Sequence, residues 1–597
     1  MKNLGKLGLF LAILILLIQG IAIQQATAQP LLISIKADGA VEGTSAIQRN
    51  DDLYTFTSNL EQASIVIEAS NIVLDGAGFN LQGEIYAVNG NNVEIKNLKI
   101  TSSATAIQIY GSNCKITNNE IQADYGGIRI RNTNNHIISG NKIDAKVEAG
   151  IAFGNSSYNT ITENTIDTSI MVGGVDLVYS DYNTFSRNTI HFISLYKSSY
   201  NILDENNLPQ GISIRNKSNN NEITENSIID FNELTEKNFM SSGSITIERS
   251  EGNLVSSNTI VNSGGIFITT SSNNVFRNNA ISTTGIGFEV SGDPQPSLSS
   301  FINDIDDSNT INGKKIYYLI DKSNLNITPS TYPNIGYLAL VNCKQMTVEN
   351  NHLNTQGIML AWTTNAQITK NDLSNNHGKG IILNYASNNQ ITQNNINSNS
   401  EAGMRISYSD DNIISGNYIT KNQEGLLLYY ASNNTIKENK IADQDTGISL
   451  HGSSSNLICH NNFVNNTKQI YDVGWHGVNQ PFPGLPLPSE NVWDNGYQTG
   501  GNYWEDYSDK YPDAKESDNS GIWDTPYMID ESNKDNYPLI EPYIINLNVP
   551  EVSTPLPSPE ERTSEEPTLI IIIALIVVVV FFSLGFIVYL KRRKNNQ

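Results

Sequence analysis

The densest group of potential metal ligands lies toward the C-terminal end of the chain, among closely spaced aromatic residues. Ca²⁺ takes several oxygen ligands from loops, so a group of aspartates is a candidate calcium site. The group lacks the spacing and the central glycine of an EF-hand loop, which favours solvated loop acids over a calcium site. The candidate ligands are Asp506, Asp509, Asp513, Asp518 and Asp524. The aromatic residues predict a compact cap and include Trp493, Tyr503, Trp504 and Trp523.

Pairs of carboxylates could support a second chemistry, the cleavage of glycans. Enzymes of this kind use two carboxylates, or an Arg or Lys base, beside the scissile bond. Asp-Asp pairs occur at Asp51-Asp52, Asp306-Asp307 and Asp410-Asp411. The last pair replaces Asn-Asn in a repeated phrase, so a solvated turn explains it. No Gly-His-Gly or Arg-Ile-Lys motif of the polygalacturonase type accompanies these pairs. The sequence therefore nominates no catalytic residue.

Four aromatic residues recur at one position of a sequence repeat of about 22 residues. Each stands five residues after the glycine of its repeat. They are Trp362, Tyr385, Tyr408 and Tyr430, at steps of 23, 23 and 22 residues. Equal steps in a repeat place them above one another on successive coils. Two interpretations stay open. One is a buried ladder of rings that seals the edge of the core, which inward parity favours, and the other is a platform on which sugar rings stack.

The phrase that positions these residues repeats about every 22 residues along the chain. Its last Asn recurs at steps of 20, 23, 23, 22 and 22, as Asn351, Asn371, Asn394, Asn417, Asn439 and Asn461. Apolar residues alternate in two short runs per phrase, which predicts two strands with one buried face. We expect four residues of these runs to be buried, namely Ile381, Leu383, Ile406 and Leu428. Their neighbours Ile382, Arg405 and Leu427 should point outward.

Stacked copies of this phrase predict an all-β fold, a right-handed parallel β-helix of the pectin-lyase-like type. One coil cannot bury its apolar face alone, whereas stacked coils pair each strand in parallel with its copies above and below. Asn residues at equivalent corners can hydrogen-bond to one another along the stack, as in other cross-β ladders. A leucine-rich repeat has a similar period but needs an L-x-x-L-x-L spacing that the chain lacks.

Both ends of the chain carry apolar segments. Two lysines, the apolar run 7–23 and Ala26-Thr27-Ala28 follow the order of a cleavable export signal, with an uncleaved anchor as the alternative. Residues 569–590 are long and apolar enough to cross a bilayer, and the basic residues behind them favour the cytoplasmic side. We therefore expect a single-pass cell-membrane protein with an extracellular ectodomain and a short cytoplasmic tail.

The predicted organisation divides the chain along these lines. The segments are a signal peptide (1–28), an N-terminal cap (29–71), a first β-helix block (72–290), an interruption within the solenoid (291–336), a second block (337–466), an aromatic and Asp-rich cap (467–548), a stalk rich in Pro, Ser, Thr and Glu (549–568), a transmembrane helix (569–590) and a basic tail (591–597).

Composition narrows the partners and the cysteine chemistry. The net charge of −23 over 597 residues opposes nucleic-acid binding, which needs a basic face. The three cysteines are far apart and show no C-x-x-C spacing, so we expect buried apolar side chains rather than disulfides. They are Cys114, Cys343 and Cys459. N-x-[ST] sequons offer candidate glycosylation sites in an exported chain, at Asn155, Asn216, Asn326, Asn433 and Asn465.

Two runs around the interruption carry a family resemblance. They are Asn309-Thr310-Ile311-Asn312-Gly313-Lys314-Lys315-Ile316-Tyr317-Tyr318-Leu319 and Gly336-Tyr337-Leu338-Ala339-Leu340-Val341-Asn342-Cys343. Within Asn-rich coils, these runs resemble the NosD-type β-helix domain (PbH1 repeats) and the archaeal cell-surface proteins that carry it. The family often has proline at the place of Lys315. Leu74-Asp75-Gly76-Ala77-Gly78 and Gly500-Gly501-Asn502-Tyr503-Trp504 are similar to segments of the same archaeal proteins.

The resemblance also raises copper, because the family's namesake assists copper-centre assembly in nitrous-oxide reductase. Fold alone does not transfer that role. Cu(I) prefers Cys and Met sulfur, with His as a further ligand. Cys459-His460 is the one adjacent Cys–His pair of the sequence, and neighbours in a strand point to opposite faces. Copper is therefore disfavoured, and a metal-delivery role is the third hypothesis.

Taken together, these patterns favour a surface protein that binds without catalysis. The predicted partner is a glycan or a cell-envelope protein along one flank of the solenoid, and no nucleic acid. The alternative is a polysaccharide lyase or a glycoside hydrolase, and the second alternative is a copper accessory protein. The sequence requires no cofactor and leaves Ca²⁺ as a candidate.

Overall fold

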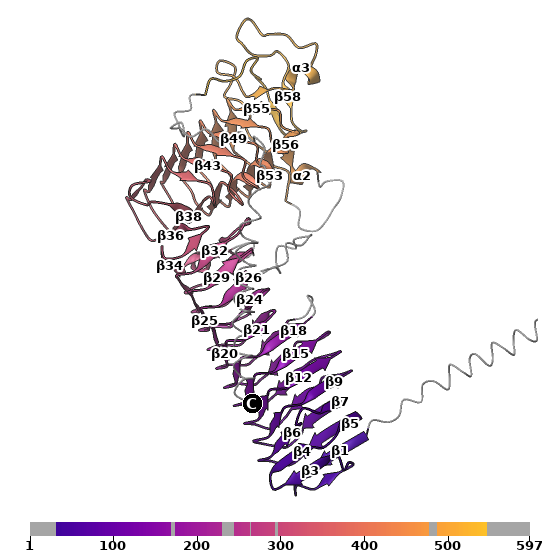
Figure 1. Ribbon diagram of the computed structural model, residues 1–597. Helices are drawn as coiled ribbons and strands as arrows, with labels where there is room; N and C mark the ends of the chain where they lie inside the picture. The colour runs from indigo at the N-terminus through magenta and orange to yellow at the C-terminus, as the bar shows by residue number, and fades with distance from the viewer. Residues whose placement is uncertain are drawn as a thin grey trace, which may run out of the picture. The chain divides into compact units, whose positions relative to one another are not determined.

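The computed structural model describes residues 31–168, 173–229, 244–262, 264–292, 296–476 and 486–545 (Figure 1). They belong to a compact unit, Met1–Val549. The predicted signal peptide, stalk, transmembrane helix and basic tail lie outside the described residues. Among the described residues, no helix is long and apolar enough to cross a membrane.

Each coil of the solenoid contains three strands, whereas the sequence predicts two. The predicted run from Ile391 to Ile396 is broken at Gln393, whose φ of +55° turns the chain between two strands. In two successive coils of the second block, each strand pairs in parallel and in register with its copy in the next coil. One coil consists of β44 (Ile381–Asn384), β45 (Gln390–Thr392) and β46 (Asn395–Asn397), and the next of β47 (Ala402–Ser407), β48 (Ile413–Ser415) and β49 (Tyr418–Thr420).

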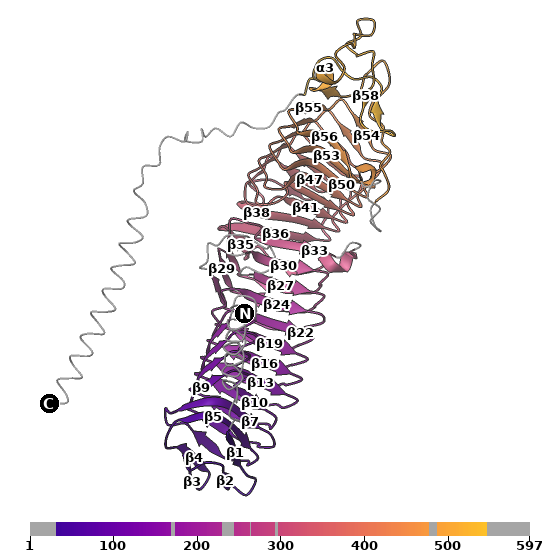
Figure 2. The same cartoon turned by 90° about the vertical axis from the view of Figure 1, so that its right-hand side faces the viewer.

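The first block has three faces of stacked strands. The first sheet follows one face (Figure 2) and consists of β7 (Asn80–Ala87), β10 (Ile107–Ile109), β13 (Ile128–Arg131), β16 (Ile151–Gly154), β19 (Val175–Val178), β22 (Ile193–Tyr196), β24 (Gly211–Arg215), β27 (Ser244–Glu248), β30 (Gly265–Thr269) and β33 (Phe288–Ser291). The second sheet consists of β9 (Lys99–Ser102), β12 (Glu120–Ala123), β15 (Lys142–Ala145), β18 (Thr165–Thr168), β21 (Thr189–Ile190), β26 (Ser227–Ile229), β29 (Thr259–Val261), β32 (Ala280–Ser282) and β35 (Thr310–Ile311). The third consists of β4 (Leu53–Phe56), β6 (Val73–Asp75), β8 (Glu94–Lys96), β11 (Lys115–Thr117), β14 (Ile137–Ser139), β17 (Thr160–Thr162), β20 (Thr184–Ser186), β23 (Ile202–Asp204), β25 (Glu222–Thr224), β28 (Leu254–Ser256), β31 (Val275–Arg277) and β34 (Asp304–Ile305).

Antiparallel strands close the N-terminal end of the stack. β3 (Ile47–Asn50) pairs with β4, and β2 (Val41–Glu42) pairs with β1 (Leu31–Ile35). β1 then joins β5 (Leu60–Ile67) in parallel, and β5 joins the first sheet at β7. A capped end of this kind covers strand edges that would otherwise be free to pair with another chain.

The second block repeats the three-strand coil after a change of connection. Its long sheet consists of β36 (Lys314–Ile320), β38 (Ile335–Val341), β41 (Ile358–Ala361), β44, β47, β50 (Glu424–Tyr429), β53 (Thr446–His451) and β56 (Lys468–Asp472). The two other faces are β37 (Asn326–Ile327), β39 (Thr347–Glu349), β42 (Gln367–Thr369), β45, β48, β51 (Thr435–Lys437) and β54 (Leu457–Cys459), and β40 (His352–Leu353), β43 (Asp372–Ser374), β46, β49, β52 (Lys440–Ala442), β55 (Asn462–Val464) and β57 (Tyr503–Trp504).

The long sheet of the second block grows from the second sheet of the first block, not from its first sheet. β35 turns back antiparallel onto β36, and β36 pairs in parallel with β38. The first sheet therefore ends at β33, which pairs with β30 and with no further strand of the described residues. The predicted interruption 291–336 thus remains within the solenoid but changes which face continues.

β38 is buried along its whole length because it belongs to two cores. Tyr337 and Ala339 pack into the core of the first block, while Leu338 and Leu340 pack into that of the second. A strand buried on both faces is a continuous apolar run rather than an alternating one. Elsewhere the predicted alternation is confirmed: Ile381, Leu383, Ile406 and Leu428 are buried, and Ile382, Arg405 and Leu427 are partly exposed.

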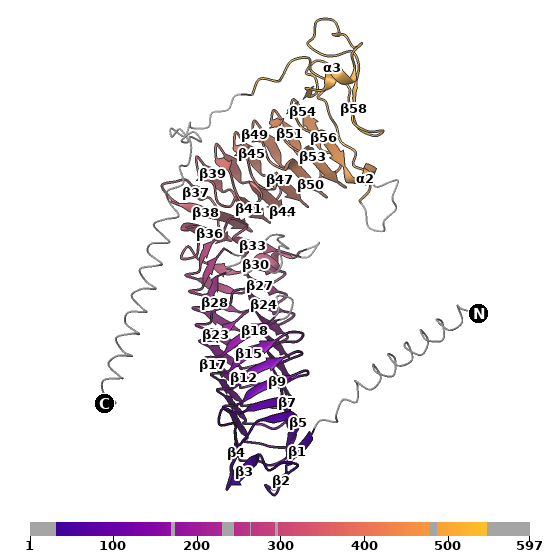
Figure 3. The same cartoon turned by 45° about the vertical axis from the view of Figure 1, so that its right-hand side comes forward.

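A cap of aromatic residues follows the last coil (Figure 3). It contains α2 (Val473–His476), α3 (Tyr507–Lys510), β58 (Tyr527–Met528) and β59 (Lys534–Asp535). Trp504 of β57 stacks between Phe463 at 4.4 Å and Tyr527 at 4.2 Å, which fixes the cap to β55. The buried Asp535 carboxylate accepts hydrogen bonds from the Trp504 indole (2.9 Å) and the Asn502 backbone (2.7 Å). Burial raises the pKa of Asp535 to about 7.

Buried asparagines join the coils along the interior, as the repeated Asn predicts. The Asn394 backbone N–H and Nδ2 both donate to Oδ1 of Asn417, at 2.9 and 3.0 Å. Nδ2 also donates to the Ile368 carbonyl at 2.8 Å, in the preceding coil. The longest ladder of the first block is Asn119, Asn141, Asn164, Asn188, Asn206, Asn226, Asn258, Asn279 and Asn309. Its counterpart in the second is Asn351, Asn371, Asn394, Asn417, Asn439, Asn461 and Asn502.

Replacing one rung tests this ladder. In Asn394→Ala, the Asn371 N–H groups lose their acceptor and the Ile368 carbonyl loses a donor, all within the interior. Each buried unsatisfied group costs about 1–3 kcal/mol, so we expect a loss of about 3–5 kcal/mol in the free energy of unfolding. Gln390→Ala removes an exposed amide from the same coil and is the control. Equal urea midpoints for the two variants would show that the ladder does not hold the coils.

Candidate functional site

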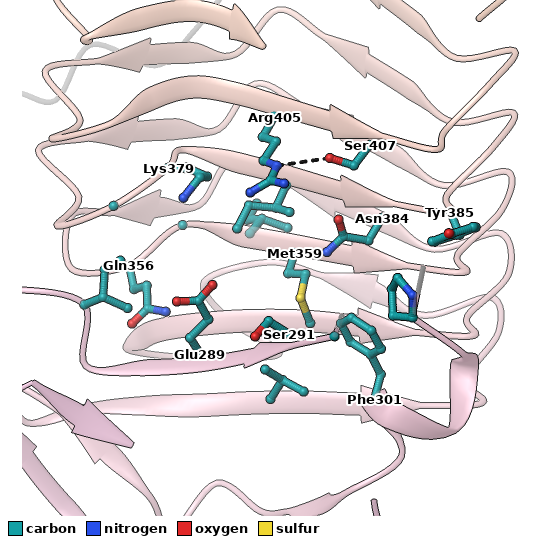
Figure 4. Close-up of a pocket in the computed structure, with 18 of the residues that line it drawn as sticks. Glu289, Ser291, Phe301, Gln356, Met359, Lys379, Asn384, Tyr385, Arg405 and Ser407 are labelled. Carbon is teal, nitrogen blue, oxygen red and sulfur yellow. Dashed lines mark hydrogen bonds between the residues drawn. The ribbon is translucent and has the colours of Figure 1, made fainter. Parts of the chain in front are cut away.

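A cavity of about 380 Å³ opens where the first sheet ends. It lies between β33 and the strands β41, β44 and β47 of the long sheet (Figure 4). Gln356 takes the place of the strand that β33 lacks. Its side-chain amide accepts a hydrogen bond from the Phe288 N–H at 3.1 Å and donates to the Phe288 carbonyl. One buried side chain thus satisfies the edge of β33 and leaves open the space that a strand would fill.

Charged and polar side chains from several coils converge on this cavity. Glu289 of β33 points across it toward Lys379 and Arg405, which come from the long-sheet side (Figure 4). Lys379 forms an ion pair with Glu401 in the next coil. Nε of Arg405 donates to Ser407 Oγ at 3.0 Å. The apolar part of the lining includes Ile358, Met359 and Ile382.

Burial is the main cause of the pKa shifts of Glu289 and Tyr408 in the cavity lining. Burial raises the pKa of the Glu289 carboxyl, while the positive charges of Lys379 and Arg405 oppose this shift. The neutral form of Glu289 is therefore favoured over a wider pH range than for an exposed carboxyl. Burial and the neighbouring Tyr429 raise the pKa of Tyr408 to about 12. The Tyr408 hydroxyl therefore remains protonated at neutral pH.

The predicted aromatic column forms one wall of the cavity. Trp362, Tyr385, Tyr408 and Tyr430 stand on successive coils with nearly parallel rings, and Tyr385 and Tyr408 line the cavity. Adjacent centroids are 4.7, 4.9 and 5.5 Å apart. All four residues have a left-handed backbone, with φ between 47° and 51°, which turns the side chain out of the strand's alternation.

The favoured interpretation of a mostly buried core ladder needs correction. The rings of Trp362, Tyr385 and Tyr408 are partly exposed, and Tyr430 is 39% exposed. Alternation along the strand predicts that these side chains point inward. The left-handed backbone at the corner breaks that alternation. A flat sugar platform is not available either, because each ring presents its face to the next ring. Phe301 covers Trp362 at 5.3 Å, and Gly452 lies against Tyr430.

A second tyrosine column lies on the first block, where the sequence analysis identifies none. Tyr158, Tyr182 and Tyr200 stack at 5.0 and 4.9 Å and are 57%, 45% and 47% exposed. Each immediately precedes an asparagine of a second buried ladder, formed by Asn159, Asn183 and Asn201. This recurring Tyr-Asn dipeptide is the signal that could have revealed the column. These tyrosines are not among the residues that line the cavity.

The candidate calcium ligands are not brought together. Asp506 accepts the Tyr527 hydroxyl with both oxygens, at 2.9 and 3.2 Å. Asp524 accepts the Lys515 N–H, and this bond lowers the pKa of Asp524. Asp509 lies within α3, and Asp513 and Asp518 lie in the loop that follows it. Among the described residues, no group of three His, Cys, Asp or Glu side chains could hold a metal ion. The calcium hypothesis therefore gains no geometric support.

The cysteine and histidine side chains do not fit a copper site in the described residues. A cysteine binds copper as its thiolate, but burial raises the pKa of Cys459 to about 11. His460 directs Nε2 to the Thr499 carbonyl at 2.8 Å, and its ring stacks on Tyr543 at 4.8 Å. Cys114 and Cys343 are buried, with their thiols against backbone carbonyls.

The Asp-Asp pairs and the sequons lie away from the cavity lining. Asp307 pairs with Lys315 at 2.7 Å, and Asp410 accepts the Ser432 N–H at a coil corner. These are structural roles on turns. The sequon asparagines Asn155, Asn326, Asn433 and Asn465 are exposed, and Asn216 is half-buried. Their glycosylation stays a prediction.

Sequence comparisons agree with this architecture. Residues 301–509 match the family described as periplasmic copper-binding protein (NosD), and residues 83–208 and 168–331 match the right handed beta helix region. The chain carries a NosD-like right-handed parallel β-helix domain. No curated protein sequence matches this NosD-like chain.

Solved structures similar to this NosD-like protein include enzymes that act on alginate. A mutant of the PL6 family alginate lyase AlyGC is 10% identical, with 73% of this chain and 92% of that chain covered and a TM-score of 0.34. The mannuronan C-5 epimerase AlgE6 A-module of Azotobacter vinelandii is 8% identical, with 72% and 90% covered and a TM-score of 0.18. The periplasmic alginate epimerase AlgG is 10% identical, with 72% and 80% covered and a TM-score of 0.16. These values transfer no activity to the present chain.

Removing one ring measures what the stacked column contributes. Tyr408 stacks on Tyr385 and Tyr430, and each such pair is worth about 0.5–1.5 kcal/mol beyond burial. We expect Tyr408→Ala to lower the free energy of unfolding by about 1–3 kcal/mol. Tyr408→Phe should lose clearly less, because the stack remains and only the hydrogen bond between the Tyr408 and Tyr429 side chains is removed. Urea unfolding provides the measurement. A loss in Tyr408→Phe as large as in Tyr408→Ala would assign the effect to the hydroxyl and contradict the stacking account.

Proposed function

We propose that this protein is exported and anchored in the cell membrane by its C-terminal apolar segment. We further propose that it binds a glycan, without cleaving it, in the cavity at the junction of the two β-helix blocks (the junction cavity). The observation that carries the glycan proposal is the cavity itself. Ligand sites are concave, mostly apolar and furnished with a few convergent polar groups. Here Glu289, Asn384 and Ser407 converge over an apolar floor, and Tyr385 and Tyr408 belong to the same lining. Such a lining suits a ligand rich in hydroxyl groups.

The non-catalytic part of the proposal rests on the ionisable groups. Glycoside hydrolysis uses two carboxylates at the scissile bond, whereas Glu289 is the one carboxylate among the described residues that line the cavity. A general base works best with a pKa near the operating pH. The pKa of Tyr408, about 12, is far above neutral, and Lys379 is held in its ion pair with Glu401. Binding therefore fits this set of groups better than cleavage.

Filling the cavity tests the glycan proposal. Ile382 of β44 lines it, and Leu427 occupies the same outward column two coils further on without lining it. The full-length protein in detergent is screened on a glycan array, and hits are incubated to detect cleavage. We expect a glycan that binds the parent and Leu427→Trp but is lost by Ile382→Trp, with no degradation. Degradation that Ile382→Trp abolishes would establish the enzyme alternative instead.

A separate experiment tests on which side of the membrane the solenoid and the basic tail lie. The apolar segment 569–590 is followed by four basic residues, and positive charge favours the cytoplasmic side. Protease added to intact cells should therefore degrade the solenoid and spare an epitope placed after residue 597. Antibodies to each part give the readout. Protection of the solenoid together with loss of the tail epitope would reverse the proposed orientation.

A further inference from the structure

Arg405 is the positively charged side chain of the cavity lining that lacks an ion-pair partner among the described residues. It occupies an outward position of β47 between Ile382 and Leu427 in the neighbouring strands, a column that is otherwise apolar there. Nε donates to the neutral Ser407 hydroxyl, and the guanidinium carbon lies 6.0 Å from the Tyr429 ring centroid. Among the described residues, no carboxylate lies within ion-pair distance of this guanidinium.

Glu289, the one carboxylate of the described cavity lining, forms no ion pair with Arg405. Lys379 is neutralised by Glu401, so that ion pair contributes no net charge. Burial raises the pKa of the Glu289 carboxyl, which disfavours its charged form. A partly buried guanidinium without an anion is costly, because desolvation is not offset by a partner. An anion supplied by the ligand would offset that cost.

The hydrogen-bonding geometry of the Arg405 guanidinium indicates which kind of anion it would bind. Arg presents a planar fork of N–H donors that matches a planar carboxylate with two parallel hydrogen bonds. With Nε held by Ser407, the terminal nitrogens of Arg405 remain to make this contact. A neutral Glu289 carboxyl can donate a further hydrogen bond to the same anion. Asn384 and Ser291 line the cavity as well and can serve the sugar hydroxyls.

We propose that the cavity takes a uronate residue of an acidic glycan, with the sugar carboxylate held by the terminal nitrogens of Arg405. This inference rests on the proposed glycan-binding function and names its ligand class. The net charge of the chain is −23, so long-range attraction does not favour an acidic polymer. Binding of such a polymer would therefore report a specific local contact.

The test compares each acidic ligand with its neutral counterpart. Trimers of galacturonate, glucuronate, mannuronate and guluronate, and the carboxyl-reduced form of each, are titrated calorimetrically into the full-length protein in detergent. A charge-assisted hydrogen-bond pair is worth about tenfold or more in affinity. We expect one uronate trimer to bind at least about tenfold more tightly than its reduced form. Arg405→Gln should remove this preference while binding of the reduced form persists, and Arg405→Lys should retain part of it.

Arg187→Gln is the matched control, because Arg187 is an exposed arginine paired with Glu163 and Glu205 on a coil corner of the first block. It should keep the preference for the uronate. Equal binding of acidic and reduced trimers to the parent would overturn the uronate inference and leave the glycan proposal standing. A sulfated trimer that binds more tightly than every uronate would also overturn it. Absence of binding by any trimer, acidic or reduced, in a protein that binds nothing on the glycan array would overturn both.

Discussion

The buried asparagine ladder is the constraint on which the rest of the solenoid depends. An interior amide must satisfy its donors and its acceptor, because a buried group without a partner costs about 1–3 kcal/mol. Beyond the first rung of a block, a ladder Asn such as Asn394 donates to the equivalent Asn of the next coil and accepts from that of the preceding coil, and this fixes the register of adjacent coils. The chain between rungs is free to vary: it spans 18 residues from Asn188 to Asn206 and 41 from Asn461 to Asn502, with the same contact at 3.0 Å. Loops and the cap are therefore inserted between rungs without disturbing the stack.

The junction between the blocks is where this constraint is interrupted. The ladder of the first block ends at Asn309, and Oδ1 of Asn351, the first rung of the second block, has no hydrogen-bond partner in the described part of the chain. At the same place the first sheet stops at β33 and β38 is shared between two cores. The cavity exists because one strand is missing from a face that is otherwise continuous. Gln356 satisfies the exposed strand edge, so the space remains open without leaving Phe288 unpaired.

Most of the fold could be predicted from the spacing of the repeat, because a period near 22 residues and strict alternation leave few alternatives. The third strand per coil could not, since the left-handed residue Gln393 divides a run whose apolar pattern looks continuous. The aromatic column could be predicted as a stack, but not its exposure, because a positive φ at Tyr408 cancels the parity argument. The site itself escaped prediction. Glu289 and Arg405 are more than a hundred residues apart, and only the change of sheet at β35 and β36 brings them to one cavity.

Because the rungs of the asparagine ladder are equivalent, the number of coils can change during evolution. Every rung offers the same donors to one neighbour and the same acceptor to the other, so a whole coil can be duplicated or lost without creating a new interface. Each coil adds about 4.8 Å to the stack. The length of the solenoid is thus adjustable in small, nearly neutral steps. A lineage can change how far the junction cavity stands from the end of the stack while the residues that line it stay as they are.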